Sequence, residues 1–482
     1  MSDPAEEIFL KGMQLENEGS WPLAADLYYR ALLADPQQEY LWAHFAYAIR
    51  FLEFPVSDPA LVKTLEICFT KRRSINPQHL AVPVFSLVRM SSDWLSHSLF
   101  LPLLRSCIVP YQEFEQYVTE LRRSLLMGEL SNTELADAIA EHCALNEYVY
   151  VETEEETARL REEKNPRLRA MYRAKKEDPL LAIPLLRALT DPVTIKVAQQ
   201  YEENPYPRWT GITRRQPRDF YVYLKSLFPE SEISKRDGAF QLLVAGSGTG
   251  QHALSSALFY KDCHVLALDI SKRALSYAKE KAEELGVENV SFLQGDILDL
   301  FLLEQQFDAI ECVGVLHHMD NPEEGLAQLV KTLKPGGLLN LGLYSERGRR
   351  DVVAARRFVE EQEYQPTLEG IRRCRQALFA LSEEHPAKPV TYSVDFFSAS
   401  CCRDLIFHAM EHRLTLEQVA ALLEKYELQF LGFDLFDKET LHKYRQRYPD
   451  DPDALSLTNW SFFEEQYPET FMGMYQFWAR AR

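Results

Sequence analysis

The sequence predicts an α/β protein in which a parallel sheet follows an all-α N-terminal domain. Between residues 240 and 343, five apolar strand-like segments alternate with helical ones, a pattern typical of a parallel sheet with right-handed crossovers. The first third of the chain has helical periodicity. Two further strand-like segments, 429–436 and 471–481, would add an antiparallel edge. The predicted sheet therefore has seven strands.

The first predicted strand opens directly into a glycine turn. Phe240–Ala245 is apolar, Gly246, Gly248 and Gly250 follow, and a helix is expected from Gln251. Glycines let the backbone approach a ligand closely and aim free N–H groups at it. Gln251 stands where the dinucleotide fingerprint needs a small residue, and the Lys and Ser/Thr of a P-loop are missing. The turn predicts a nucleotide-like ligand and disfavours dinucleotides and ATP.

Polar residues follow the later strands at the same edge of the sheet. Strand 264–270 ends at Asp269, where an acidic side chain can accept hydrogen bonds from ribose hydroxyls. The third strand ends at Asp296, and the fourth, from Phe307, runs into the His317–His318 loop. Ligands of such sheets bind outside the carboxyl ends of the strands. These residues and the glycine turn therefore predict one site.

These motifs resemble those of the class I S-adenosylmethionine-dependent methyltransferases. The matching segments are, in order, 244–250, 267–270, 294–297, 307–310, 315–319 and 333–337. Any one of them is a weak signal, but their order over about a hundred residues is specific. The resemblance implies a Rossmann-like seven-stranded sheet, methyltransferase activity and S-adenosylmethionine as the cofactor.

The resemblance also implies a set of cofactor-binding residues. The glycines would pass under the methionine part, Asp269 would hold the ribose, and Val313 would lie near the methyl donor. The full set is Gly246, Ser247, Gly248, Gly250, Asp269, Ile270, Asp296, Ile297 and Val313. Many members carry an acidic residue two places before the first glycine, and this chain has Val244 there. Another group must then help to orient the amino end of the cofactor.

His317 and His318 are the candidate catalytic residues. The expected reaction is direct displacement of the sulfonium methyl group by an O, N or S atom of the acceptor, in which the protein mainly supplies alignment. A base is needed only if that atom arrives protonated. Histidine can act as a base near neutral pH, and His408 is a third candidate. The alternative is that the His-His pair only shapes the pocket wall.

Residues 1–150 are predicted to form a helical domain that resembles tetratricopeptide repeats. Small residues, an aromatic residue and a terminal proline recur in a 34-residue pattern at Gly12, Ala24, Tyr28, Ala31 and Pro36. A second, interrupted copy begins at Trp42. Stacked repeats usually bind a peptide or protein, so this domain is expected either to recruit a protein partner or to act as a stabilising cap.

Residues 151–212 are predicted to be a charged linker and a segment that precedes the sheet. The charges of 152–176 indicate a solvated helix, which Pro166 is expected to break. Tyr206, Arg208 and Trp209 then offer aromatic faces and a guanidinium beside two prolines. This part either folds over the cofactor and contacts the substrate, or is an ordered linker between domains.

The methyltransferase core is expected at 213–344, a helical substrate cap at 345–413, and the completing helix and strand pair at 414–482. Tyr344 leaves the sheet at its ligand edge. Asp404, His408 and His412 are spaced for one helix face. Together with Arg403 they predict a polar face over the substrate; an internal hydrogen-bonded network is the alternative. Because methyl transfer requires no metal, no metal site is expected.

Composition narrows the function classes. Lys and Arg total 53 against 72 Asp and Glu, a net charge of −19, and no basic patch suggests nucleic-acid binding. The eight cysteines have no C-x-x-C pair, and no segment resembles a signal peptide or a membrane span, which predicts a cytoplasmic protein. The acceptor is expected to be a protein recruited by the repeats or a small, quinone-like metabolite. A non-catalytic cofactor-binding protein is the remaining alternative.

Overall fold

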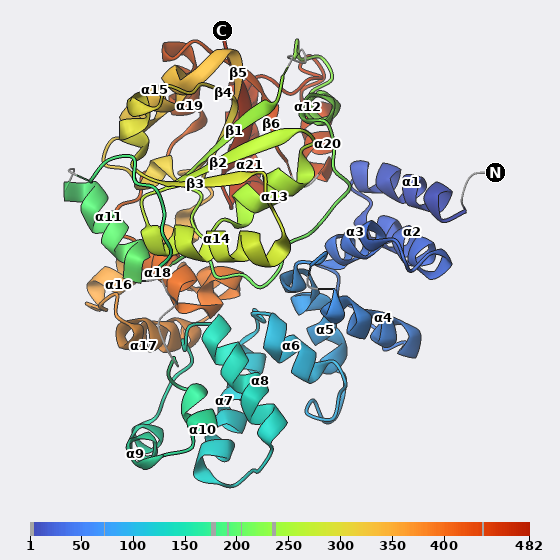
Figure 1. The fold of residues 1–482 in the computed structure, drawn as a ribbon, viewed down its shortest axis with the longest axis vertical. Helices are drawn as coiled ribbons and strands as arrows, with labels where there is room; N and C mark the ends of the chain where they lie inside the picture. Colours follow the sequence, from blue (N-terminus) through green and yellow to red (C-terminus); the bar gives the residue numbers. More distant parts are fainter. Residues whose placement is uncertain are drawn as a thin grey trace. The chain divides into compact units, whose positions relative to one another are not determined.

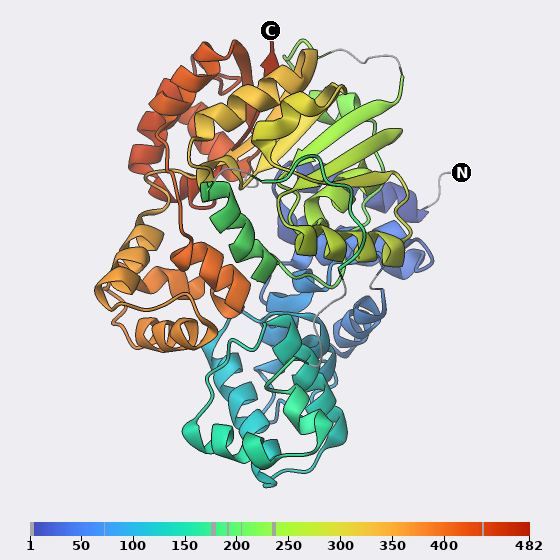
Figure 2. The same ribbon diagram turned by 60° about the vertical axis from the view of Figure 1, so that its left-hand side comes forward.

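The computed structural model divides the chain into two compact units (Figures 1 and 2). The helical unit comprises residues 1–178, 208–215 and 351–407, and the sheet unit comprises 179–207, 216–350 and 408–482. Within these ranges the structure describes residues 4–71, 73–174, 180–189, 192–203, 205–233, 238–435 and 438–482. Among the helices of those described residues, none is both long enough and apolar enough to cross a membrane.

The sheet unit is built on seven strands in the order β3-β2-β1-β4-β5-β7-β6. The strands are β1 (Phe240–Ala245), β2 (Cys263–Asp269), β3 (Val290–Gln294), β4 (Phe307–Val313), β5 (Leu333–Leu343), β6 (Leu428–Phe433) and β7 (Tyr475–Ala481). The first five are parallel, and β7 is antiparallel to both of its neighbours. This confirms the predicted fold class. The last strand begins at Tyr475 rather than at Phe471, because Pro468–Phe471 form a turn of 3-10 helix.

Helices cover both faces of this sheet, as a parallel sheet requires. Helices α13 (Gln251–Phe259) and α14 (Lys272–Leu285) lie on one side of the strands, and α15 (Pro322–Thr332) and α19 (Leu416–Lys425) lie on the other (Figure 1). Gly286, with a φ of 67°, ends α14 in the left-handed conformation, as predicted for a C-cap. The other helices of this unit are α11 (Pro192–Glu203), α12 (Phe220–Leu227), α20 (Lys438–Arg447) and α21 (Leu457–Gln466).

The N-terminal part of the helical unit is all-α, as predicted. Its helices are α1 (Pro4–Asn17), α2 (Trp21–Ala34), α3 (Glu39–Ile49), α4 (Pro59–Thr70), α5 (Ala81–Val88), α6 (Phe100–Ser106), α7 (Gln112–Met127), α8 (Thr133–Leu145), α9 (Glu154–Glu162) and α10 (Pro166–Ala170). Tyr28 packs so closely on Gly12 that a Cβ there would lie 2.7 Å from the ring. This local packing joins α1 to α2.

Residues 351–407 belong to the same unit as these N-terminal helices. They contribute α16 (Arg350–Glu361), α17 (Leu368–Phe379) and α18 (Ala399–Phe407), whose buried side chains share one hydrophobic core with α1–α8. The guanidinium of Arg375 on α17 donates two hydrogen bonds to the carboxylate of Glu115 on α7, at 3.0 and 2.5 Å. The segment expected as a substrate cap therefore completes the core of the helical domain.

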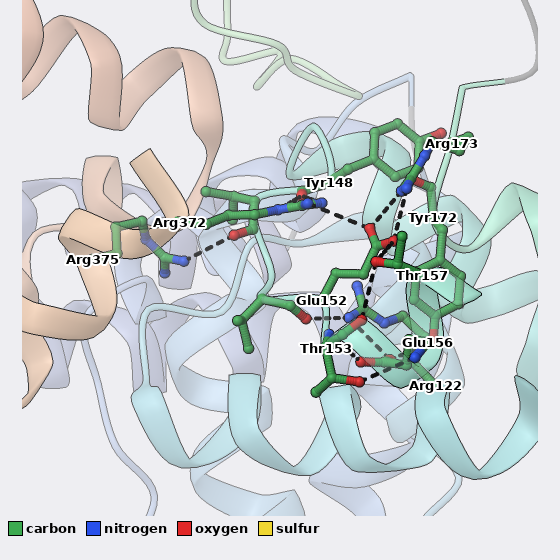
Figure 3. Close-up of polar contacts among 12 residues, drawn as sticks. Arg122, Tyr148, Glu152, Thr153, Glu156, Thr157, Tyr172, Arg173, Arg372 and Arg375 are labelled. Carbon is green, nitrogen blue, oxygen red and sulfur yellow. Dashed lines mark hydrogen bonds and ion pairs between the residues drawn. The ribbon is translucent and has the colours of Figure 1, made fainter. Parts of the chain in front are cut away.

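The described part of the charged segment, 152–174, is helical and mostly exposed, and it breaks before Pro166 as predicted, but it is not solvated throughout. It forms α9 and α10, separated before Pro166, and part of its charge is buried. Glu156 is 1% exposed; its carboxylate lies 3.5 Å from the guanidinium of Arg122 and accepts a hydrogen bond from the hydroxyl of Tyr172 at 2.6 Å (Figure 3). The charge of the segment suggested that all of it is exposed to solvent. Glu156 is buried because Arg122 on α7 lies beside its carboxylate.

Candidate active site

The glycine turn is held in a conformation that only glycine adopts readily. Gly246, Gly248 and Gly250 have φ values of 75°, 53° and 83°. A Cβ on Gly246 would lie 2.3 Å from Val315, and one on Gly250 would lie 2.4 Å from Ala278. The turn is therefore pressed between the loop after β4 and helix α14, and its backbone forms a cradle that side chains would fill.

Asp269 lies beside this cradle at the carboxyl end of β2. Its carboxylate accepts the backbone N–H of Gly248 at 2.7 Å and that of Ser271 at 2.8 Å. Burial raises the pKa of Asp269 to about 6, although the two N–H groups oppose the rise and Glu202 adds to it. The residue couples the glycine turn to the start of α14 and offers an acceptor at the position predicted for the ribose.

Asp296 lies at the carboxyl end of the neighbouring strand β3. One carboxylate oxygen caps the 3-10 helix Ile297–Leu302 through the N–H of Leu298 at 3.0 Å, and the other accepts the hydroxyl of Thr194 at 2.9 Å. Thr194 belongs to α11, which also contacts α14. The predicted adenine side of the site is thus lined by β3 and α11.

The predicted pre-sheet segment is divided between the two units. In the sheet unit, the carbonyl oxygen of Tyr206 lies 2.9 Å from the position that a Cβ on Gly248 would occupy, so this residue contacts the cradle. In the helical unit, the guanidinium of Arg208 lies 3.6 Å from the carboxylate of Glu147, and Trp209 is buried. Only Tyr206 of the three predicted substrate residues therefore lies with the sheet unit's site.

Aromatic rings gather where β4 and β5 end. The ring of His317 stacks on that of Tyr344 with 3.6 Å between their centroids, and the guanidinium of Arg349 lies 3.6 Å from the Tyr344 centroid. His318 stacks on His408 at 3.7 Å. The backbone N–H of His412 donates to the carbonyl of His317 at 2.8 Å. The structure thus brings four of the predicted side chains, and the backbone of a fifth, into one cluster.

Asp404, His408 and His412 do not share a helix face, and that prediction is wrong. Helix α18 ends at Phe407, so both histidines lie beyond it. Arg403 and Asp404 are on α18 in the helical unit, whereas His408 and His412 belong to the sheet unit. The four-residue spacing fits one face of a helix, but a helix that carried all three residues would have to extend to His412, and α18 ends five residues earlier.

His317 is fully buried, at 0% exposure. Burial lowers its pKa well below 6.5, and the neighbouring His318, Arg349, His408 and His412 add to this effect. Neither ring nitrogen has a hydrogen-bond partner among the described residues. The imidazole is therefore neutral and keeps one donor and one acceptor unused. It can anchor a polar group through either nitrogen, and its lowered pKa makes it a weak base.

Sequence reasoning missed a buried acid on β4. Glu311 is 2% exposed, and its carboxylate lies 2.9 Å from Nε2 of His252 and accepts the hydroxyl of Ser256 at 2.8 Å. Burial opposes ionisation of both groups, but their mutual attraction prevails: it lowers the pKa of Glu311 and raises that of His252. One signal in the sequence could have revealed this buried acid: Glu311 interrupts the otherwise apolar run Ala309–Val313.

Comparisons with known proteins agree with this geometry. Residues 237–373 match the family described as "Methyltransferase domain". The sheet order, the glycine cradle and this match identify a class I S-adenosylmethionine-dependent methyltransferase domain, preceded by an all-helical region. S-adenosylmethionine is the cofactor of this class, and the cradle with Asp269 fits it.

Individual relatives are 25% to 31% identical to parts of this chain. An uncharacterized protein of Synechococcus sp. is 27% identical over 272 residues, which cover 52% of this chain and 62% of that protein. The uncharacterized methyltransferase YcgJ of Bacillus subtilis is 31% identical over 97 residues, 20% of this chain and 38% of that protein. A demethylmenaquinone methyltransferase of Bacteroides fragilis is 25% identical, over 30% of this chain and 55% of that protein. The chain spans less than two thirds of each of these relatives.

Among solved structures, PKMT2 from Rickettsia typhi in complex with AdoHcy is similar, with a TM-score of 0.43 and 15% identity. The likeness covers 55% of this chain and 53% of that one.

Proposed function

We propose that the protein transfers a methyl group from S-adenosylmethionine to an O, N or S atom of a protein or peptide acceptor. The observation that supports the transfer most directly is the glycine cradle with Asp269 bonded to Gly248. The bound cofactor supplies a methyl group already activated on a sulfonium. The cradle backbone would hold its methionine part, Asp269 its ribose, and Asp296 with Ile297 its adenine.

The helical unit supports a protein acceptor. Its N-terminal helices show the Gly12–Tyr28 packing on which the repeat pattern was based, and stacked helical repeats present surfaces that bind peptides. Leu10 on α1, and Leu23 and Leu33 on α2, are each more than half exposed. Substituting these exposed apolar side chains is the best test of whether the helical unit recruits a protein acceptor.

A small-molecule acceptor is the second candidate, and the aromatic cluster favours it. The His317–Tyr344 and His318–His408 stacks gather planar aromatic rings within the sheet unit, and such rings stack on flat, quinone-like metabolites. In this case the helical domain is a structural or oligomerisation module. A cofactor-binding protein without catalysis is the third, more remote candidate.

Radiolabelled S-adenosylmethionine separates these candidates. The full-length protein is incubated with the labelled cofactor and with either the protein fraction or the small-molecule fraction of a lysate. Label in a protein band, lost when Leu10, Leu23 and Leu33 are changed together to Ser, supports recruitment. Label in an extractable metabolite that is indifferent to those changes supports the second candidate. Cofactor binding in calorimetry with no transfer to either fraction would leave only the third. Asp269→Asn is the inactive control.

A further inference from the structure

The acid that is missing before the glycine turn is present one strand away. Val244, the position that many class I methyltransferases fill with an acid, pairs in register with Glu311 on β4. In parallel strands, residues in register present their side chains to the same face of the sheet. Both side chains are buried. The sheet unit therefore carries a buried carboxylate on the expected face, displaced by one strand.

Glu311 is connected to the helix that follows the glycine turn. His252 is the second residue of α13 and Ser256 lies one turn later, so the carboxylate holds the first two turns of this helix. Tyr260, which caps the helix, adds a longer hydrogen bond at 3.4 Å. The backbone N–H of Leu254 donates to the carbonyl of Gly250 at 2.9 Å. Any shift of α13 is thus transmitted to the last glycine of the cradle.

The pair is a costly way to fix a helix for stability alone. Glu311 is buried while the His252 side chain is 39% exposed, and a carboxylate buried for such a pair contributes little net stability compared with apolar side chains of similar size. A cation in the first turn also opposes the helix dipole, and His252 stands in that turn with a raised pKa. Because an apolar pair would anchor α13 as well, the position of this charged pair at the start of the helix points to a task at the cradle.

We propose that Glu311 is a positioning residue for the cofactor site, which holds the glycine cradle through His252 and takes over from the acid absent at position 244. The inference rests on the proposed function, because the ligand that the cradle receives is the charged amino-acid end of S-adenosylmethionine. Glu311 acts through His252 and does not take part in methyl transfer.

Calorimetry with S-adenosylhomocysteine tests this on the full-length protein. Loss of a charge-assisted hydrogen bond predicts about tenfold weaker binding for Glu311→Gln and for His252→Gln. The double variant should bind no more weakly than either single variant, because both disrupt one unit. Glu464→Gln is the matched control: Glu464 is a buried acid on α21 that accepts the hydroxyls of Ser345 and Tyr475. It should lower the melting temperature but leave the affinity unchanged.

The outcomes separate this inference from the proposed function. If the wild type does not bind S-adenosylhomocysteine, the proposed function fails. If it binds and Glu311→Gln lowers only the melting temperature, as Glu464→Gln does, Glu311 is structural and the inference is overturned. Should Glu311→Gln fail to fold, His252→Gln carries the test, since its side chain is 39% exposed; unchanged affinity in that variant overturns the inference equally.

Discussion

Arg375 and Glu115 form a fully buried, two-point ion pair between helices that are 260 residues apart in the chain. Helix α17 makes a second contact with the N-terminal part of the chain: the guanidinium of Arg372 donates to the carbonyl of Tyr148 at 2.6 Å (Figure 3). These contacts fix residues 351–407 into the helical unit. Deleting residues 1–150 to test recruitment would therefore also expose the core of α17, so point substitutions are the better tool.

Arg375→Met should destabilise the helical unit strongly. It leaves the carboxylate of Glu115 buried without its partner, which typically costs about 3–5 kcal/mol. Hydrogen exchange followed by mass spectrometry should show faster exchange in both α7 and α17. Adding Glu115→Met should recover most of the loss. Arg123→Met, which removes an exposed ion pair with Glu155, is the control and should change stability by less than about 1 kcal/mol. Faster exchange in α17 alone would contradict the shared core.

Gly246→Ala should abolish cofactor binding. Its methyl group would lie 2.3 Å from Val315, at a φ of 75° that disfavours alanine. Gly286→Ala has a similar φ of 67° but nothing within 4 Å of its Cβ. It should therefore cost only about 1 kcal/mol of strain and leave affinity intact. Calorimetry together with thermal unfolding distinguishes the two. Equal loss of affinity in both variants would mean that backbone strain, not the cradle, decides binding.

Cofactor affinity should fall as the pH drops through about 6. The pKa of Asp269 is raised to about 6, and only its ionised form accepts hydrogen bonds from both ribose hydroxyls. Binding is thus strongest above that pH and weakens below it. Asp269→Asn should bind weakly at every pH, with no inflection near 6. A wild-type affinity that stays constant between pH 5 and pH 8 would rule out this role for the ionised carboxylate.

His317→Phe should give a protein that is more stable and less active. Phenylalanine keeps a ring against Tyr344 and removes two buried polar atoms that have no partner among the described residues, a change that is neutral or stabilising. If the imidazole serves the acceptor, turnover falls at least tenfold while cofactor affinity is unchanged. Thermal unfolding and single-turnover rates measure the two effects. Unchanged turnover would leave His317 only a role in shaping the wall.

The sheet was predictable because its signals are local. Each strand is an apolar run of a few residues, and the turn after β1 needs glycine for reasons visible in three adjacent positions. The Glu311–His252 pair was not predictable, since neither residue shows its partner 59 positions away. Nor does any residue near Arg375 reveal its partner Glu115, 260 positions away. The four-residue spacing of Asp404, His408 and His412 also could not show that α18 ends at Phe407.

The interleaved path of the helical unit has a consequence for synthesis. Residues 1–178 leave the ribosome long before residues 351–407, which complete their core. At about 5–20 residues per second, that interval lasts roughly 10 to 45 s. Meanwhile the apolar side chains of the N-terminal helices lack the part of their shared core that residues 351–407 supply. A chaperone that shields apolar helices is therefore most valuable to this protein during translation, before the second helical segment arrives.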